Sequence, residues 1–267
     1  MRKTINMPSL SGVVAGSLAA LTYKIGPTYF RTYFECGGTG LAVAHFGRIY
    51  VNINGKMVQT YKDLQRLFDI NGFYDRAVDT VNDFALHFSR SELDKMYRNA
   101  GGIGTMDVQT LDVQMEILAT APADISMKAY SEIDPVPQPL GVVYKIREYP
   151  FSSAVAGQVE IDKLPRGPFY AAVHLFKSDV SDVEVEADQV LQVKATKGVL
   201  ERAQRDSSPV KRVPMTAKAT SLDFCLEGDI AQAIQTDIVQ DFRIRPTLAT
   251  AGSMDVVAET IDILQGA

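Results

Sequence analysis

The sequence has no tryptophan, and only two cysteines and three histidines among its 267 residues. Cys36 and Cys225 are too few for a disulfide framework and lack the spacing of a thiolate zinc site, so we expect two buried, reduced thiols. His45, His87 and His174 stand far apart, with no second histidine or carboxylate at metal-ligand or triad spacing. We therefore expect each histidine to be structural.

Sequence motifs for nucleophilic, metal or phosphate chemistry are also missing. The chain has no Gly-x-Ser-x-Gly or HExxH pattern, and its glycine clusters lack the residues of a phosphate loop or a dinucleotide turn. Asp and Glu are abundant enough to form a carboxylate pair, but no pattern selects one. We assign no catalytic residue, no cofactor-binding residue and no metal ligand.

The charge balance argues against a nucleic-acid partner. Formal net charge is −5, from 27 Lys+Arg against 32 Asp+Glu, and no run of basic residues exceeds two. Such a chain lacks the footprint for direct nucleic-acid binding. No stretch offers the roughly 20 apolar residues of a membrane span. We expect residues 1–21 to form an extended arm or a first strand of a soluble protein, which leaves contact with lipid or a neighbouring subunit open.

What the sequence does contain is an internal repeat of a β-rich unit. Residues 49–53 alternate apolar and polar side chains, and Asn54-Gly55 supplies a tight hairpin turn. In the second half, residues 182–186 alternate in the same way, and Ala187-Asp188 takes the turn position. The two segments share one plan.

Later landmarks recur in the same order. DFALHF from Asp83 matches DFCLEG from Asp223, and the tetrapeptide LATA occurs at 118–121 and 248–251. Taking Val51 to match Val183, the offsets of the three landmarks are 132, 140 and 130 residues. Short helices are expected after four capping residues, namely Thr60, Ser91, Thr196 and Asp229.

The repeat and its linker set the domain organisation. Pro135, Pro137 and Pro139 alternate in a stiff segment that cannot enter a sheet interior. We expect an N-terminal arm at 1–21, a first domain at 22–133, a linker at 134–140 and a second domain at 141–267. Each half offers several short strands separated by turns and few helices, which indicates an all-β sandwich or jelly roll.

Two surface features have open interpretations. The densest acidic stretch comprises Asp179, Asp182, Glu184, Glu186 and Asp188, and its period-two spacing places the last four on one strand face. A solvated face is favoured, with a subunit contact and a calcium site as alternatives.

Aromatic residues gather near the N-terminus, at Tyr23, Tyr29, Phe30, Tyr33 and Phe34. Adjacent aromatics on an alternating strand point one of each pair outward. A protein–protein contact is favoured there over a sugar platform.

The order of these features resembles a known family. The segments that carry this resemblance are, in order, FRTYFECGGTG, RIYVNINGKMVQTYKDLQRLF, NDFALHF, the proline linker, VEVEADQVLQV, LDFCLEG and DFRIRPTLATAG. The chain is similar to the major capsid protein of tailless, internal-membrane icosahedral bacteriophages of the corticovirus type. The resemblance covers roughly residues 22–264. It implies two tandem jelly rolls, the double jelly roll, and a structural protein without enzymatic activity.

The resemblance also implies the partners. Such proteins associate as pseudo-hexagonal homotrimers that tile an icosahedral shell over an internal lipid membrane, alongside a vertex protein and small membrane proteins. We then expect a virion component made in the host cytoplasm, with at most peripheral membrane contact. Some members bind Ca²⁺, but no ligand residue carries over. The competing reading is a cellular two-sandwich module that binds or hydrolyses carbohydrate.

Overall fold

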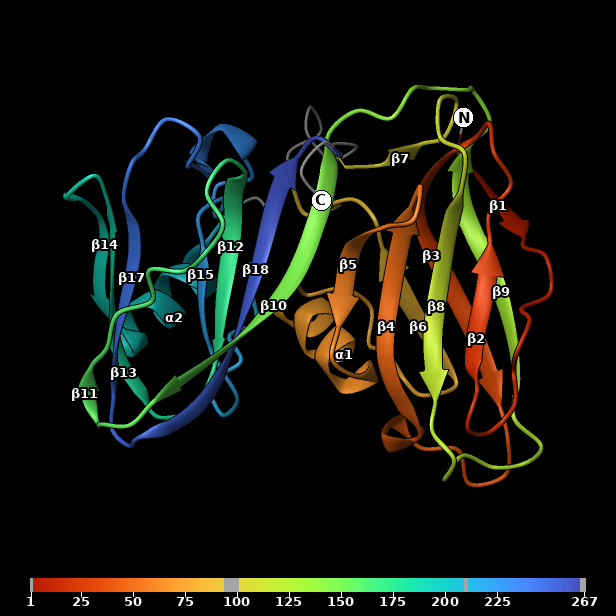
Figure 1. Cartoon of the computed structure of the whole chain (residues 1–267), viewed down its shortest axis with the longest axis horizontal. Coiled ribbons are helices and arrows are strands. Elements are labelled where there is room, and N and C mark those ends of the chain that lie inside the picture. Colours follow the sequence, from red (N-terminus) through yellow and green to blue (C-terminus); the bar gives the residue numbers. More distant parts are fainter. Residues whose placement is uncertain (1, 94–100, 209–210, 265–267) are drawn as a thin grey trace.

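The computed structural model describes residues 2–93, 101–208 and 211–264, and its strands form two sandwiches side by side (Figure 1). The elements of the first unit are β1 (Lys3–Asn6), β2 (Leu18–Thr22), β3 (Thr28–Gly37), η1 (Val43–His45), β4 (Phe46–Ile53), β5 (Lys56–Tyr61), α1 (Leu64–Phe73), β6 (Asp83–His87), β7 (Ile103–Gly104), β8 (Leu111–Ile117) and β9 (Ser126–Asp134). Those of the second unit are β10 (Val143–Ser153), β11 (Gly157–Gln158), β12 (Phe169–Phe176), β13 (Val180–Ala187), β14 (Val190–Thr196), α2 (Lys197–Asp206), β15 (Thr220–Asp223), η2 (Ile230–Gln232), β16 (Ile234–Gln235), β17 (Phe242–Leu248) and β18 (Gly252–Asp262).

Both units pair their strands in the same order. In the first unit the sheets run β1-β9-β3-β6 and β5-β4-β8-β2; in the second they run β10-β18-β12-β15 and β14-β13-β17-β11. The short strands β7 and β16 pair with β3 and β12 at matching places. Two antiparallel sheets paired in this order form a jelly roll, so the expected pair of tandem jelly rolls is confirmed.

Strand β10 joins the two units. Ile146 on β10 lies parallel to Gln59 on β5, so one sheet of each unit merges into a nine-stranded sheet. The buried cluster that fills the first unit continues across this contact, because Ala171, Cys225 and Val257 of the second unit belong to it. A second cluster fills the second sandwich. The two jelly rolls therefore share a continuous sheet and a continuous core at their junction.

The first 21 residues are built into the first unit. Strand β1 pairs with β9, and β2, which spans Leu18–Thr22, pairs with β8. Of the two sequence-based options, an arm or a first strand, the segment thus supplies first strands. After β9 the proline-rich segment crosses β7, and the amide of Met106 donates to the carbonyl of Gln138 at 3.0 Å. Gly104 permits this approach, because a Cβ there would lie 2.3 Å from the carbonyl oxygen of Pro139. The boundaries 22–133, 134–140 and 141–267 stay predictions.

The hairpin at Asn54-Gly55 is confirmed: both residues have positive φ, 52° and 75°, and they connect β4 to β5. The matching turn of the second unit is Asp188-Gln189, with φ of 48° and 65°, and not Ala187-Asp188. Ala187 is still paired with Phe242 in the sheet, which moves the turn one residue onward.

Strand pairing also corrects the register of the repeat. Val51 pairs with Gln59 and Val185 pairs with Val193, each just before a bulge at the same place, so Val185 and not Val183 is the equivalent of Val51.

The DFALHF and DFCLEG match is displaced by four residues. Strands β3 and β12 share a bulge, and the first paired residue after it is Arg31 in β3 and Ala172 in β12, so these two are equivalent. Arg31 pairs with His87, and Ala172 pairs with Asp223. Similar letters had aligned Asp83 with Asp223, but the pairing makes His87 the equivalent of Asp223.

The helices partly follow the expected caps. Helix α1 is capped by the Asp63 side chain, which accepts from the amide of Arg66 at 2.8 Å; Thr60 belongs to β5 because the strand continues to Tyr61. Thr196 holds the N-cap position of α2, but its side chain makes no capping hydrogen bond. The Asp229 segment is a short 3-10 turn, and the helix expected after Ser91 falls mainly on 94–100, outside the described residues. Within the described part of the chain, no helix has the length and apolarity to cross a bilayer.

A second repeated motif fixes the entry to β3 and β12. Gly-Pro-x-Tyr occurs at 26–29 and 167–170. In both copies the tyrosine hydroxyl donates to a carbonyl five residues earlier, from Tyr29 to Lys24 at 2.7 Å and from Tyr170 to Pro165 at 2.6 Å. In both copies a threonine hydroxyl also accepts from the glycine amide. Three of its four positions are identical in the two copies, so the motif is a signal in the sequence that aligns β3 with β12.

Candidate functional site at the junction of the two jelly rolls

The acidic stretch lies on β13 and is neutralised by its neighbours. Arg245 on β17 contacts Glu184 at 3.2 Å and Glu186 at 2.7 Å, and Lys194 on β14 contacts Glu184 at 2.8 Å. The Lys194 ammonium lowers the pKa of Glu184. Asp188 is not on this face: its carboxylate caps the amides at 240 and 241 from the turn.

Glu184 and Glu186 are therefore neutralised by Arg245 and Lys194, whereas Asp182 accepts from the hydroxyl of Thr247 at 2.9 Å. Asp179, just outside the strand, contacts Lys177 at 3.1 Å and accepts from the amide of Thr250 at 2.9 Å. Among the described residues, no group of three or more His, Cys, Asp or Glu is placed to hold a metal ion. The arrangement does not fit a calcium site, and we derive no role for Ca²⁺ from it.

The cysteines and two of the histidines are interior residues. Cys36 and Cys225 are buried free thiols, as expected, and burial raises their pKa values to about 12 and about 11. His87 is buried, with its pKa lowered by desolvation. His45 accepts from the amide of Ala42 at the start of η1. His174 lies in the junction between the units, which its isolated position in the sequence did not indicate.

The junction contains a buried ion-pair cluster. Arg90 of the first unit contacts Asp223 of the second at 3.1 Å, and Arg212 contacts the same oxygen of Asp223 at 2.7 Å. Arg90 also donates to Glu92 at 2.7 Å, and Glu92 lies 3.3 Å from Arg76. These side chains are almost completely removed from solvent. The pair Arg90–Asp223 therefore ties the two jelly rolls together inside the protein.

Opposite charges keep this cluster ionised. Burial alone would raise the pKa of Asp223, but Arg90 and Arg212 together lower it below its usual value. Burial would likewise raise the pKa of Glu92, and Arg76 and Arg90 outweigh it. Buried charges are tolerated only when they are paired in this way, and removing one partner leaves the others buried without a counter-charge.

A hydrogen-bonded chain lies beside the ion pairs. Tyr74 of the first unit donates to Glu259 of the second, whose other oxygen lies 3.0 Å from His174 Nε2; His174 Nδ1 lies 2.8 Å from Ser221 Oγ. The chain crosses the junction at Tyr74 and Glu259. The ring of Phe73 meets the His174 ring edge-on at 5.0 Å between centroids.

Burial decides the protonation of Glu259 and His174. Desolvation raises the pKa of Glu259 to about 7, against the opposing charge of Arg90 and the hydrogen bond from Tyr74. Desolvation lowers the pKa of His174 to about 3, so its ring is neutral at neutral pH. Their contact is therefore a hydrogen bond rather than an ion pair. Both side chains are fully buried, so no substrate reaches them and the group has a structural role.

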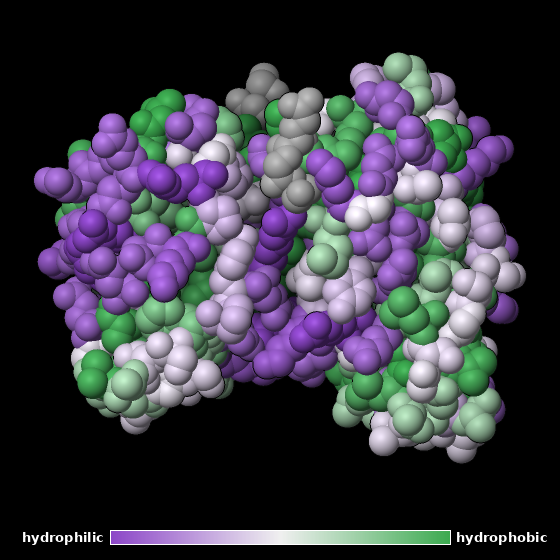
Figure 2. Space-filling model, viewed as in Figure 1, coloured by the Kyte–Doolittle hydropathy of each residue, from purple (hydrophilic) through white to green (hydrophobic). Residues whose placement is uncertain are grey.

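The rim of the junction carries exposed and half-buried charge. Figure 2 shows hydrophilic residues gathered between the two lobes, over β10 and β18. Arg66 on α1 contacts Asp255 at 3.0 Å and Glu148 at 3.4 Å, and its guanidinium stacks 3.3 Å above the ring of Phe176. Three residues further along α1, Asp69 contacts Lys218 at 2.6 Å. Helix α1 is thus held against the second unit by ion pairs at two of its positions.

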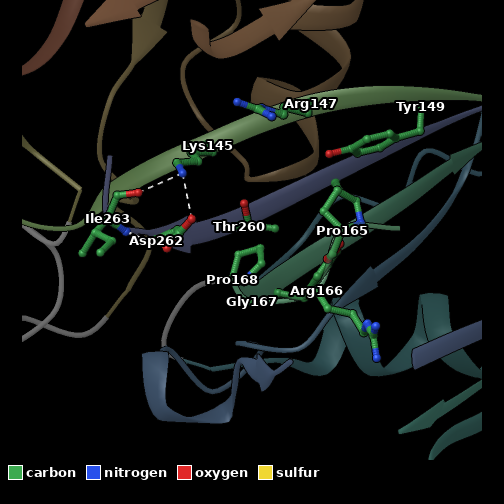
Figure 3. A pocket seen from close by; sticks show the side chains of 12 residues that line it. Lys145, Arg147, Tyr149, Pro165, Arg166, Gly167, Pro168, Thr260, Asp262 and Ile263 are labelled. Atoms are coloured by element: carbon green, nitrogen blue, oxygen red, sulfur yellow. Dashed lines mark hydrogen bonds and ion pairs between the residues drawn. The ribbon is translucent and has the colours of Figure 1, made fainter. Parts of the chain in front are cut away.

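The cavities of the second unit do not suggest catalysis. The cavity in Figure 3, about 250 Å³, lies over β10, β12 and β18. Figure 3 shows Lys145 turned toward Asp262 and Ile263; the ammonium contacts the Asp262 carboxylate at 2.7 Å and the Ile263 carbonyl at 2.9 Å. Asp262, the one carboxylate among the described residues that line this cavity, is therefore already paired with a cation.

A neighbouring cavity of about 350 Å³ comes nearest to a carbohydrate site, because Tyr149, Phe151, Glu160 and Asp162 line it. Glu160 contacts Arg245 at 2.8 Å and Arg243 at 3.2 Å. The Arg245 hydrogen bond lowers the pKa of Glu160. A general acid needs a raised pKa, so this geometry does not support glycoside hydrolysis.

Comparisons with known proteins agree over the whole chain. The family models "Viral coat protein P2 N-terminal domain" and "Viral coat protein P2 C-terminal domain" match residues 4–134 and 143–264. The major capsid protein P2 of Pseudoalteromonas phage PM2 is 26% identical over 272 residues, which cover 98% of this chain and 96% of that protein.

Solved structures show the same fold. The crystal structure of the major capsid protein P2 from bacteriophage PM2 matches with a TM-score of 0.90 and 23% identity, over 100% of this chain and 99% of that one. The STIV MCP matches with a TM-score of 0.69 and 10% identity over 100% of both chains. The PBCV-1 virus capsid protein matches with a TM-score of 0.62 and 9% identity, over 100% of this chain and 95% of that one.

Proposed function

The chain belongs to the viral coat protein P2 family, and from this premise we propose that it builds an icosahedral virion shell as homotrimers of pseudo-hexagonal outline. It is a major capsid protein, a structural component of the virus particle and not an enzyme. Self-assembly is its activity. The trimer, the icosahedral arrangement and the further partners are the parts that we propose.

The main support for the proposed trimer is the equivalence of the two jelly rolls. Ten elements recur in one order and with one pairing scheme in each half of the chain. The Arg90–Asp223 pair and the shared sheet hold the halves in a fixed orientation. Three copies around a threefold axis place six similar units around that axis, which gives the outline needed to tile a shell.

The remaining partners follow from the family and from the charge of the chain. We propose contacts between neighbouring trimers, with a vertex protein and with small membrane proteins beneath the shell. A net charge of −5 and the absence of long basic runs in the sequence support a coat that does not bind nucleic acid directly. They also favour no more than peripheral contact with an internal membrane.

Size-exclusion chromatography with light scattering tests the trimer directly. We expect a species of about 88 kDa, three chains of 29.3 kDa. A calcium chelator should leave this mass unchanged, because Arg245 and Lys194 already pair with the carboxylates of β13. A 29 kDa species that binds an oligosaccharide would overturn the proposal in favour of a carbohydrate-binding module.

A further inference from the structure

We propose that the α2–β14 end of one copy packs against the outer face of the β3–β9 sheet and the β1 edge of a second copy. This contact repeats, between chains, the internal junction that joins α1 and β5 to β10, β12 and β18. The inference rests on the proposed homotrimer and names the surfaces that form it.

The internal junction provides the template. Gln59 on β5 lies beside Ile146 on β10, and its side-chain amide donates to the carbonyl of Tyr144 at 3.2 Å. Helix α1 lays Arg66 over the ring of Phe176 on β12. An edge strand and the following helix of one unit thus cover the edge strand and outer sheet face of the next.

The same edge strand and helix recur in the second unit. Gln59 and Val193 are equivalent, since both lie directly before the shared bulge in the β4–β5 and β13–β14 pairs. Helices α1 and α2 each have ten residues, so Arg66 and Val199 are both the third. The register is supported at the eighth residue of each helix, where Asn71 donates to the carbonyl of Ala85 and Gln204 to that of Ser221.

In the second unit this surface is open and includes exposed apolar side chains. Gln59 is 1% exposed, whereas its equivalent Val193 is half-buried. Arg66 is only 8% exposed, whereas Val199 is 60% exposed. Leu191 on β14 is 51% exposed, but so is its equivalent Met57 on β5, so this position does not distinguish the two units. An exposed apolar side chain at position 199, whose equivalent is covered in the first unit, indicates a missing neighbour.

The receiving surface is also present and open, on the first unit. Strand β1 holds the place of β10, because Thr4 pairs with Glu132 as Ile146 pairs with Glu259. Its residues are mostly exposed. On the adjoining sheet face, Tyr33 on β3 lies directly across from Tyr130 on β9, and both rings are half-buried. Aromatic residues of this kind are enriched at protein interfaces.

A second copy is the occupant that fits both surfaces. Strands β14 and β1 lie at opposite ends of the long axis (Figure 1), so one chain cannot bring them together. Each is the equivalent of a strand that already forms the internal junction. A head-to-tail contact between unlike surfaces generates a ring when its rotation closes, and the proposed trimer is such a ring.

Charge placed on α2 tests the contact. Val199→Glu puts a carboxylate at the exposed apolar position of the helix, and Val155→Glu, in the exposed turn between β10 and β11, is the matched control. We expect the Val199→Glu chain to fall to about 29 kDa, whereas the control stays at about 88 kDa. Both variants should keep the wild-type far-UV circular dichroism spectrum, because position 199 is exposed within the single copy.

Cross-linking supplies the second arm. In a Val199→Cys, Glu35→Cys chain, a bis-maleimide should join copies into bands of up to three chains, because these positions are equivalent to Arg66 and Phe176. A Val155→Cys, Glu35→Cys chain should give none. A wild-type trimer that survives Val199→Glu and does not cross-link would overturn the contact and leave the proposed function standing. A monomeric wild-type chain would overturn both.

Discussion

Replacing Asp223 with asparagine is expected to destabilise the protein, because this carboxylate pairs with two buried arginines at the junction. The carboxylate contacts Arg212 at 2.7 Å and Arg90 at 3.1 Å, and it accepts from the amide of Cys225 at 3.0 Å. Asparagine preserves the shape of the side chain but leaves two buried guanidinium groups with one carboxylate fewer.

The magnitude follows from the burial of all three partners. Breaking a fully buried ion pair by removing one charge costs about 3–5 kcal/mol, because the remaining charge stays desolvated. The asparagine oxygen still accepts one hydrogen bond, so we expect the free energy of unfolding to fall by about 3 kcal/mol. Asp75→Asn is the matched control: Asp75 is exposed with φ of 52°, a conformation that asparagine tolerates.

Urea denaturation at one fixed chain concentration measures this difference. Far-UV circular dichroism is the suitable signal, because the chain has no tryptophan to report by fluorescence. The control should lie within about 0.5 kcal/mol of the wild type. An Asp223→Asn chain as stable as the control would refute the reasoning, since the ion pair would then not hold the two units together.

Two further predictions concern buried hydrogen bonds. Glu259 has a folded pKa of about 7, above its usual value of about 4.5, so the folded state holds the proton more tightly and stability falls as pH rises between these values. The wild type should therefore lose stability between pH 5 and pH 8, and the Glu259→Gln variant should lose up to about 3 kcal/mol less over the same range. Thermal melts measure this: melting temperatures that fall in parallel with pH in both proteins would contradict the prediction. Thr105→Val and Thr236→Val should each cost about 1–3 kcal/mol, because each leaves a glycine amide of a Gly-Pro turn without its acceptor, at 2.7 and 3.1 Å respectively. Unequal losses in their urea midpoints would show that the two turns are not equivalent.

The fold was accessible to sequence reasoning where the signal is local. Alternation in 49–53 and the Asn54-Gly55 turn predict a hairpin without any knowledge of the rest of the chain. LATA at 118–121 and 248–251 lies at the ends of β8 and β17, although the pairings make Ile117 the equivalent of Leu248 and so shift this match by one residue. Register was less accessible, because it depends on pairing with a distant strand. The similar segments DFALHF and DFCLEG therefore suggest that Asp83 matches Asp223, whereas the pairings with β3 and β12 make His87 the equivalent of Asp223.

The junction was not accessible in the same way. Arg90 and Asp223 are separated by 132 intervening residues, and the DFCLEG segment that begins at Asp223 does not point to Arg90 as a partner. His174 looks isolated in the sequence, although its partners Glu259 and Ser221 are present. The repeated Gly-Pro-x-Tyr motif was the available signal: aligning it would have brought β3 and β12 into register.

Electron microscopy of the purified chain tests the central claim most directly. If the chain forms the proposed coat trimer, class averages viewed down the threefold axis will show six similar lobes in a near-hexagonal ring, two from each copy. Particles that show only the two lobes of a single chain in every view, at a concentration where light scattering reports no larger species, would contradict the account.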